Sequence, residues 1–400
     1  MIFTTWPFVL FMAVVFVVYW WGIPARWRRG FLLLSSLAYF TYNLPIHTLL
    51  LGGLTVAVYM TGCLLFALRV APDAAGRARA VFVLGIVLCA GTLAFYKYSR
   101  MMAEAWNALG RSLDLGFWVP VPQLTVPLGI SFFTFEFIHY LTDLYQGRVK
   151  RVGLSDFALF AFFFPSLVSG PIKRFQIFQE QSETLGGFQA TFLYDGLARI
   201  TYGLAKKIIL ADTAGLVAAW LTTPAHHSPA HLWIAMYAYA IKIYYDFSGF
   251  TDIAIGLGQL LGYRLPENFS KPYRQPNISR FWNNWHMSLS SWIRDYLFIP
   301  LGGSRAGQAR TLFNLTLVMA ICGLWHGANW NFVVWGLWQG LGLALCRLYR
   351  PIGERIPDTR PVRWASTALT FQFVCFGWVL FAAPDLPTAL QALGRMAGRG

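Results

Sequence analysis

The chain has 400 residues, of which 56% are hydrophobic, 17% aromatic and only 12% charged, whereas an ordinary soluble domain has roughly 25% charged residues. This composition is typical of a polytopic membrane protein and argues against a soluble globular fold. The net charge of +15 does not indicate a nucleic-acid partner, because the basic residues cluster in short loops between apolar runs, as the positive-inside rule predicts for cytoplasmic loops.

A membrane-spanning helix needs about 20 apolar residues, so a chain of this length can hold roughly ten spans with short loops. We therefore expect an all-α, polytopic transmembrane helical bundle, forming one integral-membrane domain over residues 1–400 within the lipid bilayer. The five cysteines are isolated in apolar segments and form no C-x-x-C pair, which argues against a disulfide framework or a cysteine metal site.

The first part of the chain alternates apolar runs with basic loops. The loops at 24–30 and 69–79 carry arginines, so we expect them on the cytoplasmic side, which places the N-terminus outside. No positively charged leader or cleavage site marks a signal peptide, so the first run is a retained span. We expect helices over residues 6–23, 31–42, 46–68 and 81–96, and a mixed connection over 97–123.

The next predicted helix is more polar. Pro127 suits the first turn of a helix that ends near Tyr145. This helix carries Glu136, His139 and Asp143. A single Glu-x-x-His pair supplies too few ligands for a metal site in a helical bundle, so we expect structural hydrogen bonds and no bound metal.

The apolar run at 157–164 is too short to cross a bilayer, and it is interrupted by Pro165 and by Ser169-Gly-Pro171. We expect a re-entrant hairpin, which is tolerated only where protein or water surrounds the irregular backbone. The motif Gly258-x-x-x-Gly262 favours close helix packing. Further helices are expected over 196–221, 232–262 and 364–382.

Residues 244–340 hold a dense set of polar groups, including two histidines. His286 belongs to a segment with a regular aromatic pattern, whose members at spacings of three and four are Trp282, Trp285, Leu289, Trp292 and Tyr296. This spacing predicts one helix with an aromatic stripe. Because its other faces are polar, we expect this helix to be buried in protein near the membrane interface.

The second histidine, His326, follows an apolar run over 311–325. As a helix this run rises about 22 Å, which is shorter than the ~30 Å hydrocarbon core, so His326 should lie at membrane depth. The chain can loosen at 327–331 before a second apolar run over 332–348. A histidine at this depth is a candidate functional group, and the alternative is a structural histidine that joins two helices.

Two acids lie among apolar neighbours. Asp246 and Asp252 must be paired, bridged by water or neutral, and they either line a polar path or hold helices together. The chain contains no G-x-S-x-G elbow, Walker A loop or H-E-x-x-H pair. Serine-hydrolase, ATPase and zinc-peptidase functions therefore lack their usual motifs.

Several longer motifs carry a resemblance to a known family. They are Pro127-Leu-Gly-Ile-Ser-Phe-Phe-Thr-Phe135, Ser169-Gly-Pro-Ile172, Tyr245-Asp-Phe-Ser-Gly-Phe-Thr-Asp-Ile-Ala-Ile-Gly256, Pro266-Glu-Asn-Phe269, Trp285-His-Met-Ser-Leu-Ser290, Arg294-Asp-Tyr-Leu-Phe-Ile-Pro-Leu-Gly-Gly303 and Leu324-Trp-His-Gly-Ala-Asn-Trp330. With these motifs the chain resembles the membrane-bound O-acyltransferase (MBOAT) family, and most of all its bacterial branch of alginate O-acetylation and teichoic acid D-alanyl transfer proteins.

The resemblance implies a multi-span fold with re-entrant and interfacial helices around a central tunnel. It also implies acyl transfer from a cytoplasmic thioester to an acceptor on the outer side, with His326 as the principal histidine and His286 as the second. Asn283 and Asn284 depart from the basic residue that relatives often have there. The sequence after 382 is shorter than in relatives, which suggests a shortened member.

We expect His326 and His286 to be catalytic, with His326 as the base that takes the acceptor proton. The expected substrate-binding residues, all within the motifs, are Asn329, Trp325, Trp285, Asp246, Ser290 and Arg294. No bound cofactor is expected, and the donor is an acyl thioester, either acetyl-CoA or an acyl-carrier protein. The acceptor is a hydroxyl of an exported polysaccharide or a periplasmic acetyl-transfer partner, and the location is a bacterial cytoplasmic (inner) membrane.

Two alternatives remain open. One is D-alanyl transfer to teichoic acid from an acyl-carrier protein. The other, from a different class of protein, is a transporter or flippase whose histidines relay protons without forming an ester.

Overall fold

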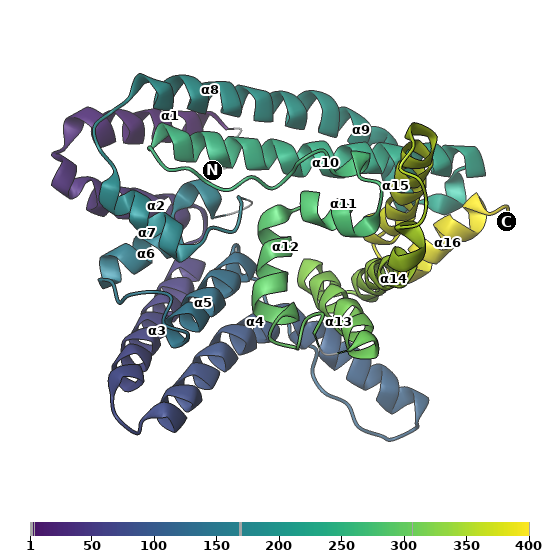
Figure 1. Ribbon diagram of the computed structural model, residues 1–400, viewed down its shortest axis with the longest axis horizontal. Coiled ribbons are helices and arrows are strands. Elements are labelled where there is room, and N and C mark those ends of the chain that lie inside the picture. The colour runs from purple at the N-terminus through teal and green to yellow at the C-terminus, as the bar shows by residue number, and fades with distance from the viewer. Residues whose placement is uncertain (1–2, 4, 168–169, 306, 400) are drawn as a thin grey trace. The chain divides into compact units, whose positions relative to one another are not determined.

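The computed structural model describes residues 3, 5–167, 170–305 and 307–399 (Figure 1). Within these ranges the chain forms helices and loops, and the β-type pairing is limited to an isolated antiparallel bridge between Phe269 and Trp285. The fold is all-α, as predicted. The chain packs into two compact units, one of Met1–Thr201 with Asp252–Pro266 and the other of Tyr202–Thr251 with Glu267–Gly400.

The first unit consists of apolar helices and shorter, buried segments. In it α3 packs against α4 and α5, and α2 packs against α6 (Figure 1). Its helices are α1 (Trp6–Val17, continued by a π-helical turn at Val18–Gly22), α2 (Arg28–Asn43), α3 (Pro45–Val70), α4 (Ala75–Ser112), α5 (Ile130–Tyr145), α6 (Leu154–Phe162), α7 (Phe175–Thr184) and most of α8 (Ala190–Ala205).

Two predicted boundaries in this unit are wrong. α4 is one helix of 38 residues, and it includes residues 97–112 that were predicted to form a connection. This stretch contains no proline, and the ion pair Arg100–Glu104 at 2.8 Å supports one helical turn of it. α5 begins only at Ile130. Gly129 before it has a φ of 80°, which is not helical, so Pro127 is not part of the helix.

The segment predicted to be re-entrant is short and buried. α6 ends at Phe162 and is followed by a 3₁₀ turn at Phe164–Ser166, whose side chains are all buried. Ser169 of the predicted break lies outside the described residues. The short helix is consistent with a re-entrant path, and that path stays a prediction.

The second unit contains both histidines of interest. Its helices are α9 (Asp212–Ala218, preceded by a π-helical turn at Lys206–Ala211), most of α10 (Pro229–Leu260), α11 (Ile278–Asn284), α12 (Met287–Ile293, continued by a π-helical turn at Arg294–Phe298), α13 (Gln308–His326), α14 (Trp330–Gly353), α15 (Arg360–Ala382) and α16 (Leu386–Met396).

Helices α13 and α14 form a tight hairpin because glycines line the contact between them. A Cβ atom at Gly323 would overlap the carbonyl oxygen of Phe332, and one at Gly336 would overlap that of Met319. A Cβ at Gly340 would lie 2.7 Å from the Cα of Thr316. Small residues allow helix backbones to approach this closely in membranes, so these glycines fix the position of α13, which ends at His326.

The motif Gly258-x-x-x-Gly262 does not bring two helices together in this way. Gly262 lies beyond the last residue of α10 and has a φ of 83°. Its role is to end that helix, because glycine adopts the left-handed conformation at low cost. The prediction that Gly258-x-x-x-Gly262 forms one helix-packing face is therefore wrong.

Four described helices, α3, α4, α14 and α15, are long and apolar enough to cross a membrane. This is fewer than the roughly ten spans that chain length alone suggested. α10, although 32 residues long, carries the charged residues Lys242, Asp246 and Asp252, and other apolar helices are shorter than a span. The chain is a multi-pass helical membrane protein.

Candidate active site

The predicted continuous helix through His286 is interrupted at that residue. α11 ends at Asn284 and α12 begins at Met287. Between them His286 has φ 43° and ψ 55°, the left-handed region that residues with a side chain rarely adopt. The expected aromatic stripe is therefore divided between two short helices, and the prediction of a single helix is wrong.

Hydrogen bonds to residues 268–270 explain the interruption. The N–H of Ser270 donates to the carbonyl of Asn284 at 3.1 Å, and the N–H of Met287 donates to that of Asn268 at 3.0 Å. The buried Oδ1 of Asn268 accepts from the N–H of Ser288 at 3.2 Å and from its hydroxyl at 2.7 Å. These bonds replace the ones that an unbroken helix would make and offset the strain at His286.

The imidazole of His286 is buried, with only 2% of the residue exposed. Its ring lies edge-on to Phe247 at 4.6 Å and 6.2 Å from the ring of Trp325. Neither ring nitrogen makes a hydrogen bond within the described residues. An unpaired buried polar group costs about 1–3 kcal/mol, so a strained backbone and an unpaired imidazole at one residue together indicate a functional position.

His326 is the last residue of α13 and is partly exposed. Three aromatic rings surround its imidazole: Trp325 at 4.7 Å, Trp335 of α14 at 5.2 Å and Phe381 of α15 at 5.1 Å. The ring of Trp325 thus contacts both imidazoles, which also interact electrostatically with each other. The second unit therefore brings together the two histidines that the sequence singled out.

The backbone leaves the helical conformation after His326, as predicted, but only over residues 327–329. Asn329 caps α14, since its Oδ1 accepts from the N–H of Trp330 at 2.7 Å, and its Nδ2 donates to the carbonyl of Pro384 at 2.9 Å. Asn331 donates to the carbonyls of Leu380 at 3.2 Å and Ala383 at 2.8 Å. These bonds attach the hairpin end beside His326 to the end of α15. Both polar atoms of the Asn329 side chain have protein partners, and its contact with substrate stays a prediction.

The other predicted substrate-binding residues of this segment, Trp285, Ser290 and Arg294, have different surroundings. Trp285 is buried among aromatic rings, including Phe281 at 5.5 Å and Trp378 at 5.0 Å. Ser290 and Arg294 line a pocket of about 340 Å³. The Ser290 hydroxyl donates to the carbonyl of Trp285 at 3.1 Å, and the Arg294 side chain is exposed beside Asp295 at 2.9 Å.

Asp246 on α10 is paired, which was one of the three predicted states of this acid. Its Oδ1 lies 3.0 Å from Nζ of Lys207, and Lys207 also contacts Asp212. Partial burial lowers the pKa of Lys207, but hydrogen bonds to Asp212 and Asp246 outweigh this effect and raise its pKa above the usual value. Lys207 therefore stays protonated and joins α10 to the π-helical turn before α9.

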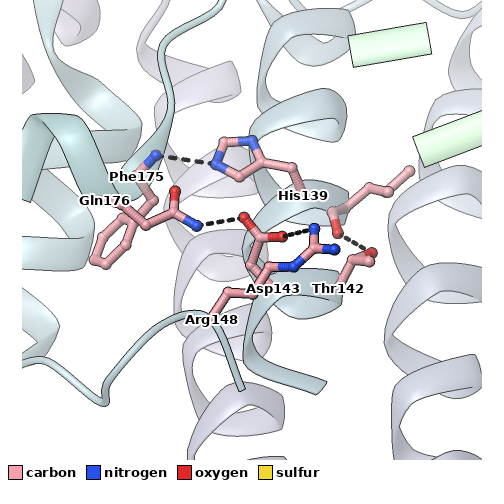
Figure 2. Close-up of polar contacts among 7 residues, drawn as sticks. His139, Thr142, Asp143, Arg148, Phe175 and Gln176 are labelled. Carbon is pink, nitrogen blue, oxygen red and sulfur yellow. Dashed lines mark hydrogen bonds and ion pairs between the residues drawn. The ribbon is translucent and has the colours of Figure 1, made fainter. Parts of the chain in front are cut away.

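A second buried polar cluster lies in the first unit. Figure 2 shows His139 and Asp143 of α5 directed at the start of α7, where Nε2 of His139 accepts from the N–H of Phe175 at 3.1 Å and Asp143 accepts from Gln176 at 2.5 Å. One turn earlier, buried Glu136 pairs with buried Lys173 at 2.5 Å.

The predicted structural role of this polar face of α5 agrees with these contacts. Lys173 was missed as the partner of Glu136, although it stands beside Arg174 directly after a long apolar stretch. In the described parts of the chain, no group of three or more His, Cys, Asp or Glu side chains is arranged to hold a metal ion.

The sequence was compared with known proteins. A profile of the membrane-bound O-acyltransferase family matches residues 123–383. A probable alginate O-acetylase AlgI of Azotobacter vinelandii is 36% identical over 406 residues, covering 100% of this chain and 79% of the relative. A peptidoglycan O-acetyltransferase of Helicobacter pylori is 32% identical and covers 94% of this chain and 74% of the relative. A teichoic acid D-alanyltransferase of Bacillus subtilis is 30% identical and covers 66% and 70%.

The matched region contains all of the predicted site residues. The resemblance that the motifs suggested is therefore confirmed at the level of the family, together with the class of reaction that its name describes. The chain belongs to the membrane-bound O-acyltransferase family, and it is an O-acyltransferase.

Proposed function

We propose that this protein moves an acetyl group from a cytoplasmic thioester to a hydroxyl group of an exported polysaccharide, directly or through a periplasmic acetyl-transfer partner, in a bacterial inner membrane. The full-length similarity to alginate O-acetylases supports this choice of acyl group and acceptor. D-Alanyl transfer is the second candidate, and the similarity that favours it covers 66% of the chain.

The observation that carries the proposal is the position of two imidazoles at interrupted helices. A hydroxyl acceptor is protonated at neutral pH, so a base must take its proton as the oxygen attacks the thioester carbonyl. His326 is partly exposed and sits at a helix end, where a substrate can approach it. His286 is buried, and its ring nitrogens make no hydrogen bond to the part of the chain that the structure describes, so a ring N–H can donate to the developing oxyanion.

The acceptor oxygen forms a bond to the acyl carbon while its proton passes to His326, giving a tetrahedral oxyanion that His286 stabilises. Collapse of this intermediate breaks the carbon–sulfur bond, and the imidazolium of His326 returns the proton to the departing thiolate. The aromatic rings around His326 limit access of water, which would otherwise hydrolyse the thioester.

The test uses membranes from cells that express the protein, supplied with a radiolabelled acetyl thioester and the polysaccharide acceptor. We expect His326→Ala to reduce labelled ester by roughly 10² to 10⁴, the usual contribution of a general base. His231→Ala is the matched control, because that histidine is exposed in the first turn of α10, and it should retain wild-type activity.

Full transfer by the His326→Ala protein would overturn the assignment. Label that crosses the membrane without forming an ester would instead identify a transporter. Mass spectrometry of the ester distinguishes an acetyl from a D-alanyl group.

A further inference from the structure

Helix α4 is much longer than a membrane crossing requires. Its 38 residues rise about 57 Å, whereas the hydrocarbon core is ~30 Å thick. The continuous apolar part of the helix ends at Tyr96, directly before Lys97. Arg69, Arg77 and Arg79 flank the turn before α4 and place that turn in the cytoplasm by the positive-inside rule, so residues 97–112 lie beyond the core on the outer side.

The part of α4 beyond the hydrocarbon core has an exposed apolar face. Met102, Trp106, Leu109 and Leu113 follow one another at spacings of four, three and four, so they form one stripe along the helix. Each of these side chains is 47–66% exposed. A contiguous exposed apolar face of this kind marks a surface that another molecule covers.

The charged residues of this segment lie on the other side of the helix. Arg100, Glu104 and Arg111 are exposed, and Arg100 pairs with Glu104 at 2.8 Å. At about 100° per residue, Glu104 and Arg111 lie about 160° and 140° from Trp106 around the helix axis. One apolar and one charged face are the pattern of a helix that lies in the plane of a membrane interface.

The loop after α4 folds back on this segment and adds to its apolar surface. The buried Asn107 side chain exchanges two hydrogen bonds with the backbone of Val119, accepting from its N–H at 2.9 Å and donating to its carbonyl at 2.8 Å. The ring of Phe117 lies 5.0 Å from that of Trp106, and the next residue, Trp118, is 68% exposed. Residues 97–119 therefore form one folded unit, which we call the α4 arm.

Two observations identify the lipid bilayer as the molecule that covers this surface. The stripe continues the exposed face of the crossing part of α4, because Leu84, Leu88 and Phe95 precede Met102 at spacings of four, seven and seven. Figure 1 shows the second half of α4 turning away from α3 and α5, and a helix that turns outward in this way brings its lipid-facing side down onto the leaflet. Tryptophan, which the arm carries twice, favours the headgroup boundary.

We infer that the α4 arm binds the outer leaflet of the bilayer, with its apolar stripe and Trp118 inserted below the headgroups and its charged face turned to water. Three basic and two acidic residues give the arm a net charge of only +1. Burial of apolar side chains therefore holds the arm on the membrane, and attraction to anionic lipids contributes little. The inference is independent of the proposed acyl transfer.

The experiment measures which solvent surrounds each face of the arm. Full-length protein with Cys63 and Cys346 replaced by alanine, because these two are partly exposed, is reconstituted in vesicles of phosphatidylethanolamine and phosphatidylglycerol. Nitroxide spin labels are attached to single cysteines. Power-saturation electron paramagnetic resonance then compares collisions with oxygen, which concentrates among acyl chains, and with a neutral nickel chelate in the water on both sides.

Met102→Cys and Leu109→Cys report on the stripe, Glu104→Cys and Arg111→Cys are the matched controls on the charged face, and Leu88→Cys gives the value for lipid. We expect the ratio of oxygen to nickel accessibility to be several-fold higher on the stripe than on the charged face. Raising the salt concentration should not change it, since salt weakens only charge attraction.

Nickel accessibility on the stripe equal to that on the charged face would overturn the inference, because the arm would then extend into water. Stripe labels shielded from both reagents would overturn it as well, because a protein would then cover this face. Labelled variants should keep the melting temperature of the unlabelled protein, since all four arm positions are exposed.

Discussion

At the scale of single residues, His286 combines a role in the backbone with a role in chemistry. Its left-handed conformation is held by hydrogen bonds from residues 268–270 to the flanking residues Asn284, Met287 and Ser288. A residue with a side chain in this conformation costs roughly 1–2 kcal/mol more than glycine. The two roles can therefore be separated by substitution.

We predict that His286→Gly is more stable than His286→Ala by about 1 kcal/mol, because glycine relieves the strain while both variants lose the same ring. Both variants should lose acyl transfer to a similar extent if the imidazole acts in chemistry. Thermal melting followed by tryptophan fluorescence, together with the transfer assay, measures the two effects. An alanine variant as stable as the glycine variant would show that the conformation carries no strain.

Asn268 gives a second residue-scale prediction. Its Oδ1 accepts two hydrogen bonds from Ser288 in a fully buried position, and leaving those donors unpaired costs about 1–3 kcal/mol. Asn268→Leu should therefore lower the melting temperature and reduce transfer, because α12 loses the cap that positions His286. Asn283→Leu, at an amide in the neighbouring helix α11, is the control and should retain more activity. Unchanged activity in Asn268→Leu would contradict this positioning role.

At the scale of elements, the α13–α14 hairpin determines where His326 lies. The two continuous apolar runs predicted both helices, and the small and amide residues between the runs predicted the interruption there. It did not reveal how closely they pack, because the glycines at 323, 336 and 340 act through contacts with the partner helix. Gly336-x-x-x-Gly340 is the informative motif of this kind, and Gly258-x-x-x-Gly262 is not.

We predict that Gly336→Ala lowers the melting temperature in detergent and reduces transfer, since the added methyl group overlaps the Met319 carbonyl and must separate the helices. Gly91→Ala in α4 is the control, because a Cβ atom there meets nothing within 4 Å. That control should be neutral or stabilising, since alanine favours a helix by up to about 1 kcal/mol over glycine. Equal behaviour of the two variants would contradict the tight packing.

At the scale of the whole molecule, the sequence predicted the all-α membrane fold and the family. It also singled out two histidines whose rings both lie beside Trp325, and their catalytic role stays a prediction. It could not predict the interruption at His286, because that break depends on Asn268, a partner outside the helical segment. It also missed the pairing of Lys173 with Glu136, since that ion pair joins residues far apart in the chain. Local spacing therefore identified the candidate groups, while tertiary hydrogen bonds determined their geometry.

The arginines at the end of α14, in the loop after it and at the start of α15 predict that this end of the two helices faces the cytoplasm. A cysteine at Arg355 should react with a membrane-impermeant maleimide only after cells are opened, whereas one at Thr388 should react in intact cells with a permeable outer membrane. The background protein should have Cys63 and Cys346 replaced by alanine, because these two are partly exposed. Labelling of Arg355→Cys in intact cells would contradict the predicted orientation.

The bridge between Phe269 and Trp285 and the backbone hydrogen bonds of residues 268–270 determine the conformation at Trp285 and His286. This pair of residues should therefore not keep its conformation when it is moved to another protein. An excised peptide covering residues 278–298 lacks residues 268–270, which hydrogen-bond to its backbone in the protein. In a membrane mimic this peptide should therefore form one continuous helix through position 286. Grafting these residues onto another scaffold would transfer the side chains but not the backbone conformation that orients them. The functional unit includes a stretch of backbone that carries none of the chemistry itself.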